Sequence, residues 1–277
     1  DTFSFQGFTP TNSICLINTK DGSLTRAIEH DNYLKLTSIT EPTPDGQAVW
    51  ASLLDNNTIE NDTPLVQVRR YNLTSGTMES QINIQNLGGV NEINLSPDGQ
   101  WLAVSSFKSL QILSVADGNL TWTFLPDQYE ISTTRFSADS KTLAIGSWDG
   151  SVKLYNIPQG ELIEQFASLA YPTVTNAEDA LSVRDLLFSP DNNRLYRLIN
   201  NSVLDVSTLV QAISLESGED VFRVFGRNTF SRPAISPDLA LLVAGGYEDG
   251  SVFAWSAANG KLLYTLPGHS EMVVQTL

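Results

Sequence analysis

The side chains that most often carry out catalysis or bind metal ions are scarce in this sequence. Cys15 is the only cysteine, and His30 and His269 are the only histidines, among 277 residues. A metal site needs clustered histidine, cysteine or carboxylate ligands, which two histidines far apart in the chain do not supply. Neither histidine lies in a nucleophile motif that would indicate a Ser-His-Asp triad. We therefore predict no catalytic centre, no metal site and no organic cofactor.

Oxygen ligands, in contrast, are abundant, with 31 Asp and Glu residues in the chain. The run DNNTIEND, Asp55 to Asp62, is rich in the oxygen ligands that calcium prefers, but it lacks the glycine that an EF-hand loop requires after Asn57. We expect a solvated loop there. Folding could still bring two carboxylates together as in glycosidases. A glycan-active hydrolase or lyase with carboxylates at a channel mouth is therefore an alternative function.

The net charge and the hydrophobic pattern exclude two classes of partner. A formal charge of −15 repels phosphate backbones and anionic lipid surfaces. No apolar stretch approaches the ~18 residues of a membrane span. We predict no nucleic-acid partner and no membrane insertion. The chain starts without a methionine, which indicates a segment of a longer chain. Its low lysine content and many Ser, Thr and Asn residues favour an extracytoplasmic setting.

The elements that must position any site are repeated along the chain. In each repeat a short turn motif, such as SPDG at Ser96, lies between two apolar runs. The motif begins at Thr43, Ser96, Ser137, Ser189 and Ser236. A second turn follows a further apolar run, and it closes at Gly22, Gly76, Gly118, Gly160, Gly218 and Gly260. The commonest spacing of these glycines is about 42 residues, which is the length of one propeller blade. Asp and Gly favour such tight turns between paired strands.

This pattern predicts an all-β protein, a β-propeller of four-stranded antiparallel blades. Six third strands and six fourth strands can be counted, so we predict six blades. Seven blades with one incomplete is the alternative. We expect residues 1–277 to form one domain whose last blade is shared between the chain ends. Phe3–Phe8 would supply the second strand of that blade and Met272–Leu277 the first, which leaves no open sheet edge.

Two segments resemble the WD-repeat family. They are SWDGSVKLYNIPQGELIEQF from Ser147 and YEDGSVFAWSAANGKLLYTLPGH from Tyr247, the second ending in the family's Gly-His pair at Gly268-His269. The resemblance extends over the whole chain and implies the propeller fold. It says little about function, because many functions share this fold.

The family often ties a blade together with a hydrogen-bonded set of His, Ser or Thr, Asp and Trp. Ser147 and Asp149 match the Ser and Asp places of one blade, but Tyr155 stands where the Trp would be. Asp249 and Trp255 match in another blade, in which Tyr247 occupies the Ser place. The repeats are therefore degenerate.

Both histidines, His30 and His269, match the family's His place. The resemblance therefore implies that they pack in the structure and do not bind a ligand. No blade shows the complete set in the sequence.

Extra residues collect at the turns that join second to third and fourth to first strands. The insertions are Asn56 to Pro64, Ser168 to Ser182 and Asn200 to Ser207. These connections all open on one face of a propeller, and insertions on one face often mark the binding face. We predict that a protein or peptide binds there.

Aromatic and Arg side chains are enriched at interface hot spots. The candidates on this face are Arg227, Phe230, Arg232, Tyr171, Trp148 and Tyr247. The main hypothesis is a non-enzymatic interaction scaffold or sensor module. A purely structural support domain is a further alternative.

Overall fold

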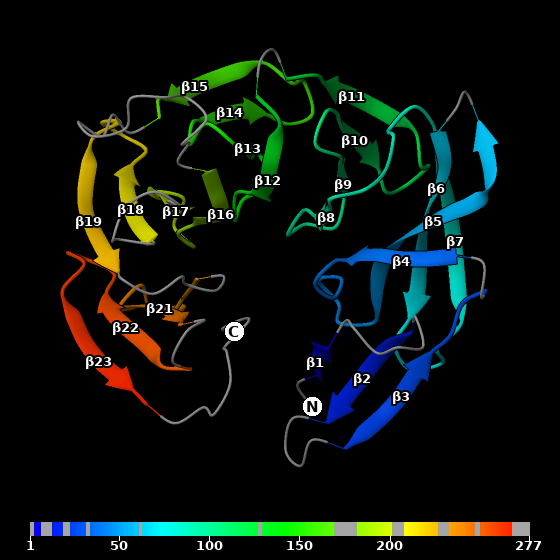
Figure 1. Ribbon diagram of the computed structural model, residues 1–277, viewed down its shortest axis with the longest axis horizontal. Coiled ribbons are helices and arrows are strands. Elements are labelled where there is room, and N and C mark those ends of the chain that lie inside the picture. Colours follow the sequence, from blue (N-terminus) through cyan, green and yellow to red (C-terminus); the bar gives the residue numbers. More distant parts are fainter. Residues whose placement is uncertain are drawn as a thin grey trace. The chain divides into compact units, whose positions relative to one another are not determined.

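The structure of the chain is a computed structural model that describes residues 3–6, 13–18, 23–31, 34–60, 63–126, 129–168, 182–200, 208–226, 233–246 and 250–267. The described segments contain 23 β-strands and no helix. They form six antiparallel sheets, five with four strands and one with three (Figure 1). The prediction of an all-β protein is confirmed.

Three sheets belong to a first compact unit, Asp1–Leu125. We call the sheets blades 1 to 6 in chain order. Blade 1 contains β1 (Phe3–Gln6), β2 (Ile14–Asn18) and β3 (Leu24–Ile28). Blade 2 contains β4 (Leu34–Ile39), β5 (Ala48–Glu60), β6 (Thr63–Asn72) and β7 (Met78–Ile84). Blade 3 contains β8 (Glu92–Leu95), β9 (Trp101–Ser105), β10 (Leu110–Ser114) and β11 (Leu120–Phe124).

The other three sheets belong to a second unit, Pro126–Leu277. Blade 4 contains β12 (Ile131–Phe136), β13 (Thr142–Ser147), β14 (Val152–Asn156) and β15 (Leu162–Phe166). Blade 5 contains β16 (Ser182–Phe188), β17 (Arg194–Asn200), β18 (Thr208–Ser214) and β19 (Asp220–Gly226). Blade 6 contains β20 (Ala234–Ile235), β21 (Leu241–Gly245), β22 (Val252–Ser256) and β23 (Leu262–Leu266).

Each four-stranded sheet is a meander in which strands adjacent in sequence pair with one another. Apolar side chains fill the space between neighbouring sheets of a unit. One such layer lies between blades 2 and 3, where Trp50 and Val68 pack with Leu102 and Val104. Another lies between blades 5 and 6, around Tyr196 and Trp255. This is the blade arrangement of a β-propeller with about six blades, so the predicted fold class is confirmed.

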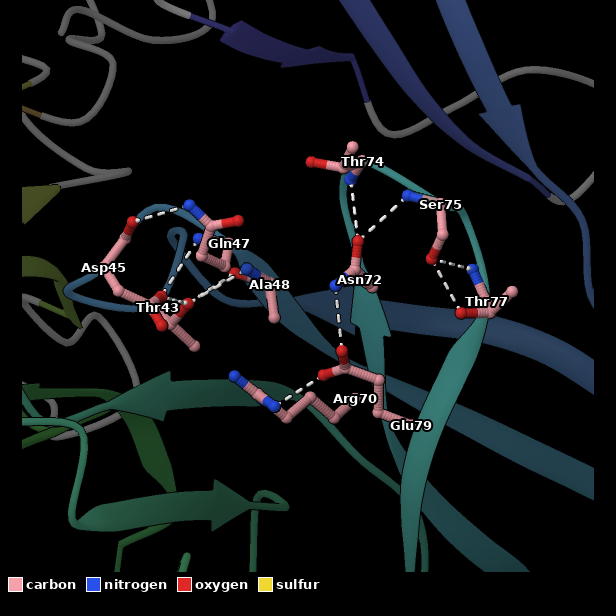
Figure 2. A network of polar contacts seen from close by, with 10 residues as sticks. All are labelled: Thr43, Asp45, Gln47, Ala48, Arg70, Asn72, Thr74, Ser75, Thr77 and Glu79. Carbon is pink, nitrogen blue, oxygen red and sulfur yellow. Dashed lines mark hydrogen bonds and ion pairs between the residues drawn. The ribbon is translucent and has the colours of Figure 1, made fainter.

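The first turn of each four-stranded blade has the same hydrogen bonds in all five instances. In blade 2, the Thr43 hydroxyl donates to Asp45 Oδ1, which also accepts from the backbone N–H of Gln47 at 3.0 Å (Figure 2). The third residue after the hydroxyl residue has a positive φ, and it is glycine in blades 2 and 3 but Leu239, at φ 59°, in blade 6. The Ser-Asp bond therefore holds the turn even where the residue is unfavourable in this conformation.

One predicted loop is a strand. Asp55 to Asp62 was expected to be a solvated loop within an insertion, but β5 continues to Glu60 and pairs with the start of β6, Ile59 opposite Pro64. The ladder is irregular between Asp55 and Ile59, where a bulge absorbs the extra residues. The β-branched Thr58 and Ile59 favour this extended hairpin over a loop. Most of the other two insertions, 169–181 and 201–207, lies outside the described residues.

The shared last blade stays a prediction. β1 pairs with β2 in antiparallel register, Phe3 opposite Asn18, which leaves blade 1 with three described strands. This is the position that the sequence predicts for the Phe3–Phe8 segment. Its expected partner, Met272–Leu277, lies outside the described residues.

Candidate functional site

The turn between β13 and β14 exposes a large aromatic side chain, and hydrogen bonds hold the backbone of this turn in place. Trp148 is 42% exposed, which is unusual for tryptophan. Its backbone N–H donates to the carbonyl of Glu130 at 3.1 Å, and Gly150 N–H donates to the carbonyl of Ser147 at 3.1 Å. The Ser147 hydroxyl also donates to the Glu130 carbonyl, at 3.3 Å. The turn is therefore fixed to the segment that precedes β12.

Carboxylates flank this tryptophan. Glu130 is exposed, and Asp149 is partly exposed. Asp149 Oδ1 accepts from the Ser151 N–H at 2.9 Å and from the Ser151 hydroxyl at 2.6 Å. The hydrogen bonds described for Asp149 are made with Ser151, its neighbour in the turn.

A buried arginine of blade 5 supports the same turn. Arg197 is 2% exposed, and its Nη1 donates to the Gly150 carbonyl at 2.8 Å and to the Ala167 carbonyl at 3.0 Å. Its Nε donates to Gln211, which in turn donates to Asp220. Burial lowers the pKa of Arg197 to about 10, although nearby Asp220 favours the charge. The side chain remains a cation at neutral pH, and its bond to the Gly150 carbonyl holds the turn that contains Trp148.

Blade 3 has a similar exposed aromatic that the sequence reasoning missed. Phe107 lies in the turn between β9 and β10 and is 45% exposed. Ser106 N–H donates to the Ser109 carbonyl at 2.8 Å and closes this turn. Aligning the first turns of blades 3 and 4 would have identified it, because Phe107 follows Ser96 at the same spacing as Trp148 follows Ser137.

The structure brings together only some of the predicted site residues. Trp148, Ser147 and Asp149 lie in one turn, as described above. Trp255 is buried and stacks on Phe253, with ring centroids 5.8 Å apart. The remaining candidates lie outside the described residues: Arg227, Phe230, Arg232, Tyr171, Tyr247, Asp249 and His269.

His30 follows β3 and precedes β4. Both of its ring nitrogens are buried and have no hydrogen-bond partner. Burial lowers the pKa of His30, the positive charge of Arg69 lowers it further, and Asp31 opposes the shift. A histidine in this state favours its neutral form. Among the described residues, no group of three or more His, Cys, Asp or Glu side chains is placed to hold a metal ion.

Comparison with known proteins identifies WD-repeat relatives. The family model "WD domain, G-beta repeat" matches residues 118–156, which run from the closing turn of blade 3 to the third strand of blade 4. The chain is 25% identical to "Periodic tryptophan protein 2 homolog" of Dictyostelium discoideum over 193 residues, 68% of this chain and 19% of the relative.

A second kind of relative is a translation factor subunit. The chain is 26% identical over 189 residues to "Eukaryotic translation initiation factor 3 subunit I" of Aspergillus oryzae, covering 65% of this chain and 52% of the relative. The protein of the same name from Neurospora crassa is 27% identical over 179 residues, which is 64% of this chain and 50% of the relative. The chain thus spans about a fifth of the first relative and about half of the others.

These relatives overturn one expectation. The composition favoured an extracytoplasmic setting, but relatives named as subunits of a translation initiation factor act in an intracellular process. The expectation is wrong, because high Ser, Thr and Asn content also suits the turns and exposed strand edges of a repeat protein. In the part of the chain that the structure describes, no helix is long and apolar enough to cross a membrane.

Proposed function

We propose that this chain, a WD-repeat-like β-propeller with degenerate repeats, is a non-enzymatic interaction module. In this proposal it binds a protein or peptide on the face formed by the connections from second to third strands and from fourth to first strands. The observation that carries the proposal is Trp148, which is 42% exposed on a turn held by backbone hydrogen bonds and by the buried Arg197. A rigid, exposed tryptophan loses little conformational entropy on binding and is the residue type most enriched in hot spots.

Further candidates on the connections of this face belong to the proposal. They are Tyr247 beside the corresponding turn of blade 6, Tyr171 in the long connection after β15, and Arg227, Phe230 and Arg232 between β19 and β20. Phe107 joins them because it is exposed at the same place in blade 3. The relatives support an interaction role, since one of them is named as a subunit of a larger factor.

The first-turn aspartates with shifted pKa values are not suited to the acid role of a glycan hydrolase. A general acid needs a carboxyl group whose pKa is raised. The hydrogen bond from Thr43 instead lowers the pKa of Asp45, and the bonds from Ser189 and Ser236 do the same for Asp191 and Asp238. These carboxylates are anionic turn residues at neutral pH.

The test is a quantitative pull-down from cell extract with the 277-residue chain. Trp148→Ala, and separately Arg227→Ala, Phe230→Ala and Arg232→Ala combined, should deplete the same captured proteins. Loss of a hot spot costs ~2 kcal/mol or more, which is roughly a thirtyfold loss of affinity. Leu162→Ala is the matched control, because Leu162 is 53% exposed but lies on the outer strand of the same blade.

Folding of each variant is checked by its melting temperature. Undiminished capture by folded Trp148→Ala and by the folded triple variant would contradict the proposal. Equal loss with Leu162→Ala would also contradict it, because the effect would then not be specific to the turn face.

A further inference from the structure

A groove lies beside β10 of blade 3, and it is separate from the turns described above. Residues 109–125 of blade 3, which include most of β10 and β11, line one side of it. Residues 83–86, at the end of β7 in blade 2 and directly after it, line the other side. The volume of this β10 groove is about 480 Å³. Sites for small ligands are typically ~300–1,000 Å³, so the groove is large enough for a short peptide segment.

Strand alternation brings polar side chains to the groove. Ser109, Gln111 and Leu113 alternate along this part of the chain, so their side chains point to the same face of the sheet. The Gln111 Nε2 donates to the Gln85 carbonyl of blade 2 at 2.9 Å. Because Gln85 and Gln111 both line the groove, the amide end of the Gln111 side chain lies at the groove.

This hydrogen bond orients the Gln111 amide, since its nitrogen donates to blade 2 and its oxygen is left as the acceptor. Gln111 and Ser109 are each 7% exposed. Neither Gln111 Oε1 nor Ser109 Oγ has a hydrogen-bond partner among the described residues, and neither oxygen is fully enclosed by protein atoms. Both residues line the groove, so a ligand in the groove reaches these two oxygens.

The equivalent glutamine of blade 5 has no such capacity left. Gln211 stands at the same place in the third strand, seven residues before the glycine that closes the second turn. Its Oε1 accepts from Arg197 and its Nε2 donates to Asp220, so both ends of the amide are used within the blade. Gln111 uses its nitrogen alone. A side chain that is more than nine-tenths buried and keeps an unused, accessible acceptor needs an explanation, and a ligand supplies one.

The lining of the β10 groove favours an uncharged ligand. None of the residues that line it is charged, although the chain has a formal charge of −15. Lys108 and Asp117, which flank the lining residues in the sequence, have opposite signs. A charged ligand would lose hydration without gaining a charged partner in the lining. Leu120 and Leu125 line the groove and are more than half exposed, so they offer apolar contacts.

From the accessible Gln111 and Ser109 oxygens and the uncharged lining, we infer that the β10 groove binds an uncharged, extended peptide segment through a Gln or Asn side chain. An N–H of its primary amide donates to Gln111 Oε1, and its carbonyl accepts from the Ser109 hydroxyl. Residues two apart on a strand are ~7 Å apart, a span that one amide group with a hydrogen bond at each end covers.

The backbone of the segment stays at the rim, because its own side chains hold it away from the buried oxygens. Its residues two positions to either side of the amide residue contact Leu120 and Leu125. The β10 groove uses neither Trp148 nor any other residue of the proposed interaction face. The inference can therefore be tested independently of the proposed function.

The probe is the blocked pentapeptide Leu-Ser-Gln-Ser-Leu, titrated against the full ¹⁵N-labelled chain. The readout is the pair of side-chain N–H resonances of Gln111, assigned with Gln111→Met. We expect a saturable shift of these resonances. Peptides with methionine or glutamate in place of glutamine should bind roughly tenfold more weakly or worse, because methionine has no amide and glutamate adds a charge.

Variants of the groove test its location. Thr123 lies opposite Gln111 in the strand register, and Thr123→Phe should abolish binding by filling the middle of the groove. Thr123 is exposed and phenylalanine is favoured in strands, so we expect this variant to fold. Thr265→Phe is the matched control, because Thr265 has the same place on the outer strand of blade 6, opposite Phe253. It should leave the affinity unchanged.

Ser109→Ala removes one of the two hydrogen bonds and should weaken binding by roughly two- to tenfold. If Thr123→Phe does not fold, Ser109→Ala and the peptide series still decide the question. The inference is overturned if the Gln111 resonances do not respond to the glutamine peptide, or if the methionine or glutamate peptide binds as tightly. Wild-type affinity of the folded Thr123→Phe variant or of Ser109→Ala would also overturn it.

Discussion

Blades 2 and 5 have the same strand order but differ in the hydrogen bonding of their buried polar side chains. In blade 5, the buried Tyr196, Arg197 and Gln211 all have hydrogen-bond partners. In or directly before blade 2, buried polar atoms of His30, Trp50, Gln67 and Tyr71 have none.

Each buried polar group without a partner costs about 1–3 kcal/mol, so a native chain tolerates few of them without a reason. In blade 5 the buried polar side chains named above are hydrogen-bonded, and Phe222 packs closely against Tyr196 and Gly260. Blade 2 and the residue directly before it retain buried polar atoms without a hydrogen-bond partner, and of these residues only Trp50 lines a cavity, of about 380 Å³. The comparison teaches that degenerate repeats can share a strand order while differing in how completely their buried polar groups are hydrogen-bonded.

The largest expected difference in unfolding free energy concerns one row of residues paired across the sheet. This row is Tyr196, Ala212 and Phe222 in blade 5, and Trp50, Arg70 and Ser80 in blade 2. Phe222 is 9% exposed, lies with its ring centroid 6.2 Å from that of Tyr196, and packs so closely that a Cβ on Gly260 would be 2.5 Å from its ring. Phe222→Ala should lower the free energy of unfolding by ~3–5 kcal/mol. Ser80→Ala, at the equivalent place beside the cavity, should change it by less than about 0.5 kcal/mol. Urea denaturation measures both, and similar values would show that the two rows are packed alike.

Much of the fold could be predicted from the sequence because turn chemistry and alternating apolar runs are local signals. The five Ser-Asp or Thr-Asp turns form as their residues indicate. The prediction was wrong at Asp55 to Asp62, where β-branched residues continue β5 in a region rich in polar side chains.

The candidate site was harder to predict. Trp148 was found because it stands beside a recognisable Gly turn. The β10 groove could not be found in this way, because it depends on how β10 and β11 align and on which residues of blade 2 lie beside them. Register across strands is set by bulges, such as the shift between Ile112 and Leu113, which the sequence alone does not reveal.

A smaller difference separates two buried tyrosines. Tyr196→Phe removes a hydroxyl that donates to the Ala257 carbonyl and should cost about 0.5–1.5 kcal/mol. Tyr71→Phe removes a buried hydroxyl without a partner, so it should be neutral or stabilising. Both changes conserve ring packing, and denaturant midpoints at constant m-value compare them directly. Destabilisation by Tyr71→Phe equal to that of Tyr196→Phe would mean that the Tyr71 hydroxyl also has a bonding role.

The smallest expected effect is a pH dependence that originates beside blade 2. Burial, followed by the charge of Arg69, lowers the pKa of His30 below its ordinary value of 6.5 in the folded state. The unfolded chain therefore binds a proton at His30 before the folded chain does. Stability from this residue is present above pH 6.5, declines as the pH falls below 6.5, and is fully lost below the folded pKa.

The carboxylates of the first turns behave differently, since the Thr43 hydrogen bond lowers the pKa of Asp45 below 3.8 and its contribution is lost only in stronger acid. Melting temperatures between pH 7 and pH 5 therefore isolate histidine. His30→Leu should flatten the decline over this range. His269→Gln should leave it in place, and His30 and His269 are the only two histidines in the chain. A decline that persists in His30→Leu but disappears in His269→Gln would assign the pH dependence to His269 and show that His30 is accommodated beside blade 2 without a cost in its charged form.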